Sequence, residues 1–154
     1  MFPRGIETVI NPKQLVALGC WIMLASLQGC SRESDNADVQ FAKTAFFAMV
    51  NGPAAETMID WERFQAMGDD LGKEYQALAS DAEKAFFRKQ FLLGFAASTP
   101  NIKENPKGIT HWRVQSENAS ETIVAADMQK GVVLLITISK RDGKQKLSAM
   151  KIEE

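Results

Sequence analysis

The chain has 154 residues and a formal net charge of −1, and 45% of its residues are hydrophobic. This length is one domain's worth of chain, and the composition is that of an ordinary globular protein. Because phosphate binding requires clustered lysines and arginines, the balanced charge gives no support to a nucleic-acid-binding function.

Both cysteines, Cys20 and Cys30, lie in the opening segment of the chain. If that segment is removed before Cys30, the remaining body can form no internal disulfide. The chain also contains a single histidine, so the sequence predicts neither a cysteine-based nor a histidine-based metal site. We therefore expect no metal and no cofactor.

An apolar segment, residues 15–27, follows a mildly positive lead and is followed at once by polar residues. It is shorter than the roughly 20 residues that a transmembrane helix needs. A charged lead, an apolar block of about 7–15 residues and small residues at its end are typical of a secretory signal peptide. A buried hydrophobic helix is the alternative.

The end of this segment, LQGCS at residues 27–31, resembles the lipobox of bacterial lipoproteins. The resemblance implies cleavage between Gly29 and Cys30 and attachment of lipid to the sulfur of Cys30. Gln28 stands where alanine or serine is commoner, and Cys20 is a weaker candidate because no leucine leads its preceding residues. Two or three acyl chains would anchor the protein firmly, where one chain binds only reversibly.

The same resemblance implies a cellular location and a domain organisation. In Gram-negative lipoproteins the residue after the cysteine influences sorting, and Ser31 favours the outer membrane, facing the periplasm. The chain then divides into a signal peptide over residues 1–29, a lipidated cysteine with a short tether over residues 30–38, and one domain over residues 39–154. The eight residues after Cys30 reach at most about 26–29 Å.

The body begins with helical patterns. Residues 37–50 carry apolar side chains at helical spacing, which predicts a first helix. The sequence NGP at residues 51–53 ends it, and its proline can open a short helix over residues 53–59. Asp60 is a suitable N-cap for a further helical turn over residues 61–67.

A brief helix is expected around residues 73–78, after two interrupting glycines. Ser80 and Glu83 match a capping box and open the strongest helical pattern, residues 81–97. Phenylalanines occupy one face of this helix and further apolar residues broaden it, so we expect burial on more than one side. The sequence STP at residues 98–100 ends it.

After residue 108 the period of the apolar residues changes from about 3.6 to 2, as expected for strands. Four strands are predicted, at residues 110–115, 121–128, 132–138 and 146–152. Their connections are short, and Asp142-Gly143 is the clearest hairpin signal. Together these segments predict a four-stranded antiparallel meander.

Helices followed by strands predict an α+β fold in which N-terminal helices pack on the sheet. The order of elements over residues 37–154 resembles the NTF2-like and cystatin-like folds, in which a curved antiparallel sheet wraps around a long helix. No specific motif carries this resemblance, so it implies a fold and says little about activity.

Two apolar features are candidates for a binding surface. The third predicted strand, residues 132–138, is apolar on both faces; either it is a central strand covered on both sides, or it forms an apolar pocket or a partner-binding face. The helical phenylalanines could line a lipid or sterol cavity, although aromatics at helical spacing more often form the core. They are Phe46, Phe47, Phe86, Phe87, Phe91 and Phe95.

Three residues are weak candidates for catalysis. His111 is the only histidine and could act as a general base if Glu117 or Asp60 lay beside it. NTF2-like enzymes of the ketosteroid isomerase kind use an aspartate in an apolar pocket with tyrosine or aspartate donors, and Asp60 and Tyr75 are loose counterparts. The alternatives are a solvated His111 and an Asp60 that only caps a helix.

We therefore expect a non-enzymatic, lipid-anchored module that binds a protein partner or an apolar small ligand, and neither nucleic acid nor metal. The alternatives are a small isomerase or dehydratase in the same fold and a purely structural envelope lipoprotein. An enzyme predicts ionisable groups converging in an apolar pocket. A binding module predicts an apolar cavity or patch without them, and a structural role predicts fully packed apolar faces.

Overall fold

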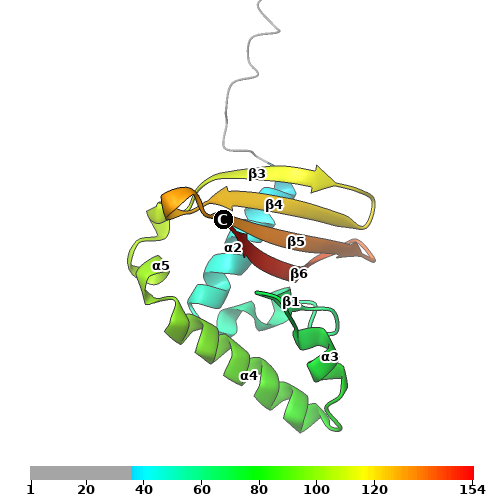
Figure 1. Cartoon of the computed structure of the whole chain (residues 1–154). Helices are drawn as coiled ribbons and strands as arrows, with labels where there is room; N and C mark the ends of the chain where they lie inside the picture. The colour runs from blue at the N-terminus through cyan, green and yellow to red at the C-terminus, as the bar shows by residue number, and fades with distance from the viewer. Residues whose placement is uncertain (1–35) are drawn as a thin grey trace, which may run out of the picture. The chain divides into compact units, whose positions relative to one another are not determined.

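The computed structural model describes residues 36–154. The predicted signal peptide, the cleavage site at Gly29, the lipidated Cys30 and most of the predicted tether lie outside the described residues. Within residues 36–154 the helices precede the long strands, which confirms the α+β class (Figure 1).

The helical elements stand mainly in the first half of this region. The α-helices are α2 (Ala37–Val50), α3 (Leu71–Gln76), α4 (Asp81–Ser98) and α5 (Pro100–Glu104), and the 3₁₀ turns are η1 (Pro53–Met58), η2 (Pro106–Gly108) and η3 (Gln129–Gly131). The strands are β1 (Gln65–Ala66), β2 (Asp69–Asp70), β3 (Thr110–Glu117), β4 (Glu121–Asp127), β5 (Val133–Arg141) and β6 (Lys144–Glu153). The first predicted helix thus matches α2 at both ends, and the capping box of Ser80 and Glu83 is formed at the start of α4.

The sheet has six strands in the order β2-β1-β6-β5-β4-β3. The four long strands pair antiparallel in chain order, but β1 pairs parallel with β6. The predicted four-stranded antiparallel sheet is therefore wrong in strand number and in direction. The helical turn expected over residues 61–67 ends early, because Met67 and Gly68 take positive φ angles of 53° and 99° and reverse the chain between β1 and β2.

The hairpin between β5 and β6 has the turn that its sequence predicts. Asp142 and Gly143 have φ angles of 50° and 69°. Two positive φ angles in a two-residue loop define the turn that matches the twist of antiparallel strands. This turn brings Arg141 opposite Lys144 and sets the register of the two strands.

The hydrophobic core lies between α2 and one face of the sheet. Figure 1 shows α2 crossing behind the long strands, with α4 running below them. From α2 the core receives Phe46 and Met49, and from the central strand β5 it receives Leu134, Ile136 and Ile138. Leu135, on the opposite face of β5, is only 4% exposed, so the two-faced apolar pattern belongs to a central strand buried on both sides.

The aromatic side chains form a continuous chain of ring contacts within this core. The rings of Phe46 and Phe95 lie 6.2 Å apart, and those of Phe64 and Phe91 lie 5.4 Å apart. Neighbouring contacts extend the chain to Trp112 at one end and to Tyr75 at the other. Five of the six helical phenylalanines therefore pack into the core, and Phe86 is 65% exposed.

Helix α4 is less buried than its sequence pattern predicts. Leu92 is its only fully buried residue, and Leu93 is 43% exposed. The expected burial on more than one side is therefore wrong. The physical reason is that α2 already covers the sheet, so α4 packs against α2 and η1 with a single face.

Candidate binding cleft

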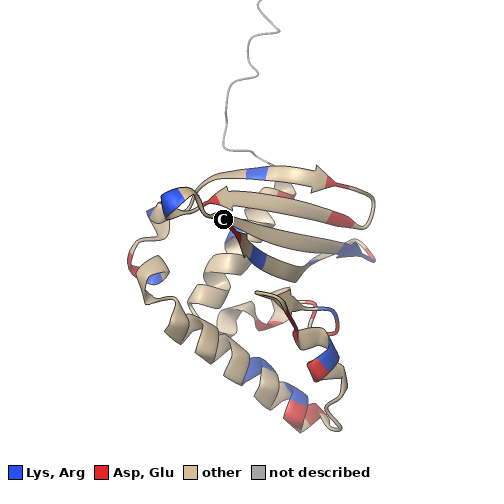
Figure 2. Ribbon diagram, viewed as in Figure 1, with Lys and Arg blue, Asp and Glu red and all other residues tan. Residues whose placement is uncertain are grey.

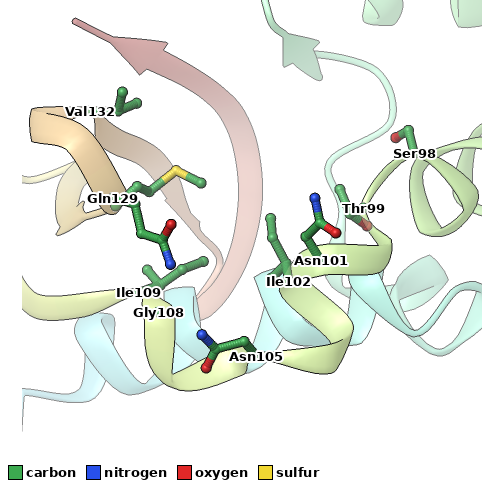
Figure 3. A pocket seen from close by; sticks show the side chains of 10 residues that line it. Ser98, Thr99, Asn101, Ile102, Asn105, Gly108, Ile109, Gln129 and Val132 are labelled. Atoms are coloured by element: carbon green, nitrogen blue, oxygen red, sulfur yellow. The ribbon is translucent and has the colours of Figure 1, made fainter.

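A cleft opens where α4, α5 and η2 lead into the sheet and face the turn η3 (Figure 3). Its volume is about 330 Å³, at the lower end of the roughly 300–1,000 Å³ that is usual for ligand pockets. The lining residues are Ser98, Thr99, Asn101, Ile102, Asn105, Gly108, Ile109, Met128, Gln129 and Val132.

One wall of the cleft is built by two prolines that restart short helices. Pro100 is the first residue of α5 and Pro106 is the first residue of η2. Proline is preorganised for the first helical position and cannot continue the preceding hydrogen-bond ladder. The chain is therefore broken into short turns after α4, while Thr99 closes that helix by donating its hydroxyl to the Phe95 carbonyl at 2.9 Å.

The facing wall is the tight turn between β4 and β5. Lys130 and Gly131 have φ angles of 66° and 81°, and the Met128 amide donates to the Val132 carbonyl at 2.8 Å. Gln129 belongs to this turn, and its side chain points toward the opposite wall (Figure 3). A β-carbon at Gly108 would lie 3.5 Å from the side-chain nitrogens of both Asn105 and Gln129, so the two walls meet there.

The lining is neutral and has both polar and apolar parts. The floor is aliphatic and consists of Ile102, Ile109, Met128 and Val132. Asn101, Asn105 and Gln129 add three carboxamides, and none of their side-chain amides bonds to another residue that the structure describes. A carboxamide offers two donor hydrogens and an acceptor oxygen. The cleft can therefore hold an apolar group and meet uncharged hydrogen-bonding groups at its rim.

Asp60 lies outside this cleft, at a turn next to β6. Its backbone amide donates to the Leu147 carbonyl at 2.9 Å, and its carbonyl accepts from the Arg63 amide at 3.0 Å. Its carboxylate accepts a long hydrogen bond of 3.4 Å from the Ser139 hydroxyl. These contacts indicate a structural role for Asp60 at the start of a turn.

Tyr75 lies in the contact between α3 and α4. Its hydroxyl accepts a 2.7 Å hydrogen bond from Arg88, whose Nε atom also bonds to Glu56 at 2.8 Å. The Glu56 carboxylate, together with Tyr75, raises the pKa of Arg88 above its ordinary value. The ring packs on Trp61 and Phe87, so the tyrosine links two helices through the aromatic chain.

His111 is exposed on the edge strand β3. Its Nδ1 atom lies 3.2 Å from a carboxylate oxygen of Asp127, and Arg113 donates to the same carboxylate at 2.7 Å. The hydrogen bond from Arg113 holds the pKa of Asp127 below its ordinary value. Glu117, the other expected partner of His111, instead pairs with Lys140 at 2.6 Å. No hydrogen bond joins any two of Asp60, Tyr75 and His111.

An ionic cluster that the sequence did not predict lies at the first turn of α2. Asp38 is 6% exposed, and its carboxylate accepts from the Thr122 hydroxyl at 2.6 Å, from Lys140 at 2.7 Å and from the Gln145 side chain. Burial alone would raise the pKa of Asp38, but these hydrogen bonds outweigh it and hold the pKa below the ordinary value. The predicted tether, which ended at residue 38, therefore overlaps α2.

Two further hollows lie elsewhere on the domain. One, of about 340 Å³, lies on the sheet face opposite α2 and is lined mainly by polar side chains: Arg63, Gln65, Glu121, Thr137, Ser139, Ser148 and Ala149. The other, of about 480 Å³, is an apolar groove beside Phe86 on α4. Neither is lined by Asp60, Tyr75 or His111.

Two negative observations concern the described part of the chain. No helix among residues 36–154 is long and apolar enough to span a membrane. Within the same residues, no three histidine, cysteine, aspartate or glutamate side chains are grouped closely enough to hold a metal ion.

No protein-family model and no curated protein matches the chain. Among solved structures, the chain is similar to a de novo designed protein with a curved β-sheet, with 15% sequence identity and a TM-score of 0.42 over 76% of this chain and 97% of that chain. Neither value is high enough to transfer a function.

Proposed function

We propose that the chain is a lipid-anchored lipoprotein of the cell envelope whose α+β domain binds a protein partner or an apolar small ligand. The observation that carries the binding role is the neutral cleft, with three unpaired carboxamides above an aliphatic floor. The anchor rests on the sequence LQGCS at residues 27–31, with Cys30 as the acylated residue. In a Gram-negative host the domain would face the periplasm from the outer membrane.

We further propose that the domain is of the NTF2-like or cystatin-like kind. The support is the element order and the packing of the long helix α2 against one face of β3 to β6. The cleft lies at one end of the layer between the helices and the sheet, where α5 and η2 join the sheet.

The chemistry of the cleft suits binding better than catalysis. Its side chains are amides, hydroxyls and aliphatic groups, and none of the ten lining residues is ionisable near neutral pH. The hydroxyls of Ser98 and Thr99 are already bonded to the Phe95 carbonyl. An occupant would gain affinity by covering the aliphatic floor and specificity by pairing with the carboxamides.

The two alternatives have less support. An isomerase or dehydratase needs ionisable groups that converge in an apolar pocket, and Asp60, Tyr75 and His111 lie apart from one another and from the cleft. A purely structural lipoprotein would have fully packed apolar faces, whereas Phe86 and Leu93 are exposed.

The anchor is tested by comparing the two cysteines. Cys30→Ser should abolish labelling of the chain by radioactive palmitate and leave an uncleaved precursor. Cys20→Ser is the matched control and should be labelled and processed like the parent. Labelling that persists in Cys30→Ser, or that is lost in Cys20→Ser, would contradict Cys30 as the lipidated residue.

An apolar occupant is tested with N-phenyl-1-naphthylamine, an uncharged apolar dye that fluoresces in apolar surroundings. Gly108→Leu should block dye binding, because a side chain at residue 108 would project toward Asn105 and Gln129. Ala119→Leu, which adds the same side chain to an exposed turn, should bind dye like the parent. Both variants need unchanged thermal midpoints for this comparison.

A protein partner is tested by photo-cross-linking in the membrane of the expressing cell. Gln129→Cys carries a benzophenone maleimide inside the cleft, and Gln115→Cys carries it on the exposed side of β3. A discrete adduct at residue 129 that is absent at residue 115 would identify a partner. If no such adduct forms and Gly108→Leu leaves dye binding unchanged, the cleft is not the binding site.

A further inference from the structure

The polar hollow on the sheet face opposite α2 is separate from the cleft. Its volume is about 340 Å³, and its lining comes from β6, β5, the start of β4 and the segment that enters β1. In the paired strands Ala149 stands opposite Thr137, and Ser139 stands opposite Glu121. The charged residues of β5 stand only at its C-terminal end (Figure 2). Hydroxyl groups therefore line the middle of the hollow, and its charges come from the flanking segments.

Two hydroxyl groups in the hollow are buried but weakly bonded. Ser139 is 5% exposed and Ser148 is 6% exposed. The acceptors of Ser139 are the Asp60 carboxylate at 3.4 Å and the Lys146 carbonyl at 3.3 Å, and the acceptor of Ser148 is the Thr137 carbonyl at 3.3 Å. Hydrogen bonds between oxygens are usually about 2.7–2.8 Å long. Because poorly bonded buried groups cost free energy, both serines would gain from a polar ligand.

The oxygen atoms around Ser139 are arranged to accept hydrogen bonds from an ammonium group. Glu121 is the cross-strand neighbour of Ser139, so their β-carbons lie about 4.5–5.5 Å apart. A carboxylate oxygen of Asp60 lies 3.4 Å from the Ser139 hydroxyl. Glu121 is exposed and forms no ion pair with any residue between 36 and 154. An ammonium group has three donor hydrogens, so it can bond to both carboxylates and the hydroxyl.

The other side of the hollow suits a carboxylate. Arg63 and Gln65 stand there, in the segment that enters β1. The Arg63 guanidinium is exposed and has no carboxylate partner within the described part of the chain. A guanidinium donates two parallel hydrogen bonds to a carboxylate, and the Gln65 carboxamide is a further donor. With a cation on this side and two carboxylates around Ser139, the hollow is complementary to a zwitterion.

The separation of the two sides determines the length of that zwitterion. Strand β6 lies between β1 and β5, and neighbouring strands are about 4.7–4.9 Å apart. The two sides are therefore separated by about 10 Å. An extended peptide spans about 3.3–3.6 Å per residue. A free amino acid is too short to reach both sides, whereas a peptide of about two or three residues can do so.

We propose that the hollow binds a short zwitterionic peptide. Its amino group lies among Ser139, Glu121 and Asp60, and its carboxylate lies against Arg63. The peptide groups between them bond to the hydroxyls of the floor, including that of Ser148. This site goes beyond the proposed apolar ligand or protein partner of the cleft, and it depends neither on the cleft nor on the lipid anchor.

The site is tested by an NMR titration of triglycine into the purified full chain in detergent. Amide resonances around the hollow should shift. Arg63→Gln and Glu121→Gln should each weaken binding by at least about tenfold, because each removes a charged hydrogen-bonding partner. The matched controls Arg141→Gln and Glu104→Gln remove the same charges from exposed positions outside the hollow and should bind like the parent. All four variants should keep the thermal midpoint of the parent.

Modified peptides test the two ends of the ligand. Triglycine amide lacks the carboxylate and N-acetyltriglycine lacks the ammonium group, so each should bind the parent at least about tenfold more weakly than triglycine. The inference is overturned if millimolar triglycine shifts no resonance, if the modified peptides bind as well, or if Arg63→Gln or Glu121→Gln leaves the affinity unchanged. Gly108→Leu obstructs only the cleft and should bind triglycine normally. Loss of triglycine binding in that variant would assign the peptide to the cleft instead.

Discussion

Helices α2 and α4 are both long, yet the domain uses them differently. In α2, seven of 14 residues are buried, whereas in α4 one of 18 is buried. Helix α2 lies between the sheet and α4, so its whole apolar stripe is covered. Helix α4 lies on the outside and has α2 and η1 on one side only. Buried side chains, and with them the stability of the core, are therefore concentrated around α2, while α4 leaves apolar side chains exposed to solvent.

The largest expected difference between the two helices comes from removing one ring on each. Phe46→Ala deletes a ring that is 2% exposed and packs against Phe95 and Trp112. We expect the free energy of unfolding to fall by about 3–5 kcal/mol. Phe86→Ala should change it by less than about 0.5 kcal/mol, as for other exposed sites. Urea denaturation measures both, and similar losses in the two variants would contradict the division between α2 and α4.

The next effect concerns the ionic cluster that holds the start of α2. Asp38→Asn removes the charge that accepts from Lys140, Thr122 and Gln145. Hydrogen bonds to charged groups contribute about 1.5–3 kcal/mol, so we expect a loss of that order in urea at neutral pH. Because Lys140 stays protonated and loses one of its two carboxylate partners, the variant should not recover this loss at moderate pH.

The same variant should also differ from the parent in how its stability changes at acidic pH. The pKa of Asp38 lies below its ordinary value in the folded domain, so the carboxylate stabilises the fold at pH values above the unfolded-state pKa. That contribution is lost as the pH falls from about 5 through the folded pKa. Asp38→Asn should therefore lose less stability than the parent over this range. Parallel losses in parent and variant would show that other carboxylates cause the acid sensitivity.

The last prediction is a small gain in stability, and it concerns α4. Gly94→Ala removes the helix-interior glycine, and the added methyl group meets no described atom within 4 Å. We expect α4 to gain about 0.5–1 kcal/mol of stability from this change. Hydrogen exchange of the α4 amides measures this gain locally. A loss of protection would contradict the open space around residue 94.

Local signals predicted the elements that depend on neighbouring residues. The apolar spacing over residues 37–50 and the sequence NGP after it give both ends of α2. Ser80 and Glu83 identify the start of α4, and Asp142-Gly143 identifies the last hairpin. In each case the residues that determine the structure lie within a few positions of one another, so a single sequence contains the information.

The remainder depends on residues far apart in the chain. The partners of Asp38 include Thr122 and Gln145, which are 84 and 107 positions away. Strand β1 is two residues long and forms because β6 lies beside it. The cleft draws on residues between 98 and 132 with no shared motif. The periodicity of α4 showed which side is apolar but not whether another element covers it.

The order of strands has a consequence for when the domain can form. Strand β6 lies between β1 and β5, although it follows every other strand along the chain. Its pairing with Gln65 and Ala66, and the bridge between Ile59 and Leu147, join the C-terminal strand to the segment that follows η1. A chain that emerges from the ribosome or crosses a membrane N-terminus first cannot close its sheet until β6 follows. Such non-local pairing delays folding, and for a chain exported in an unfolded form this delay is an advantage.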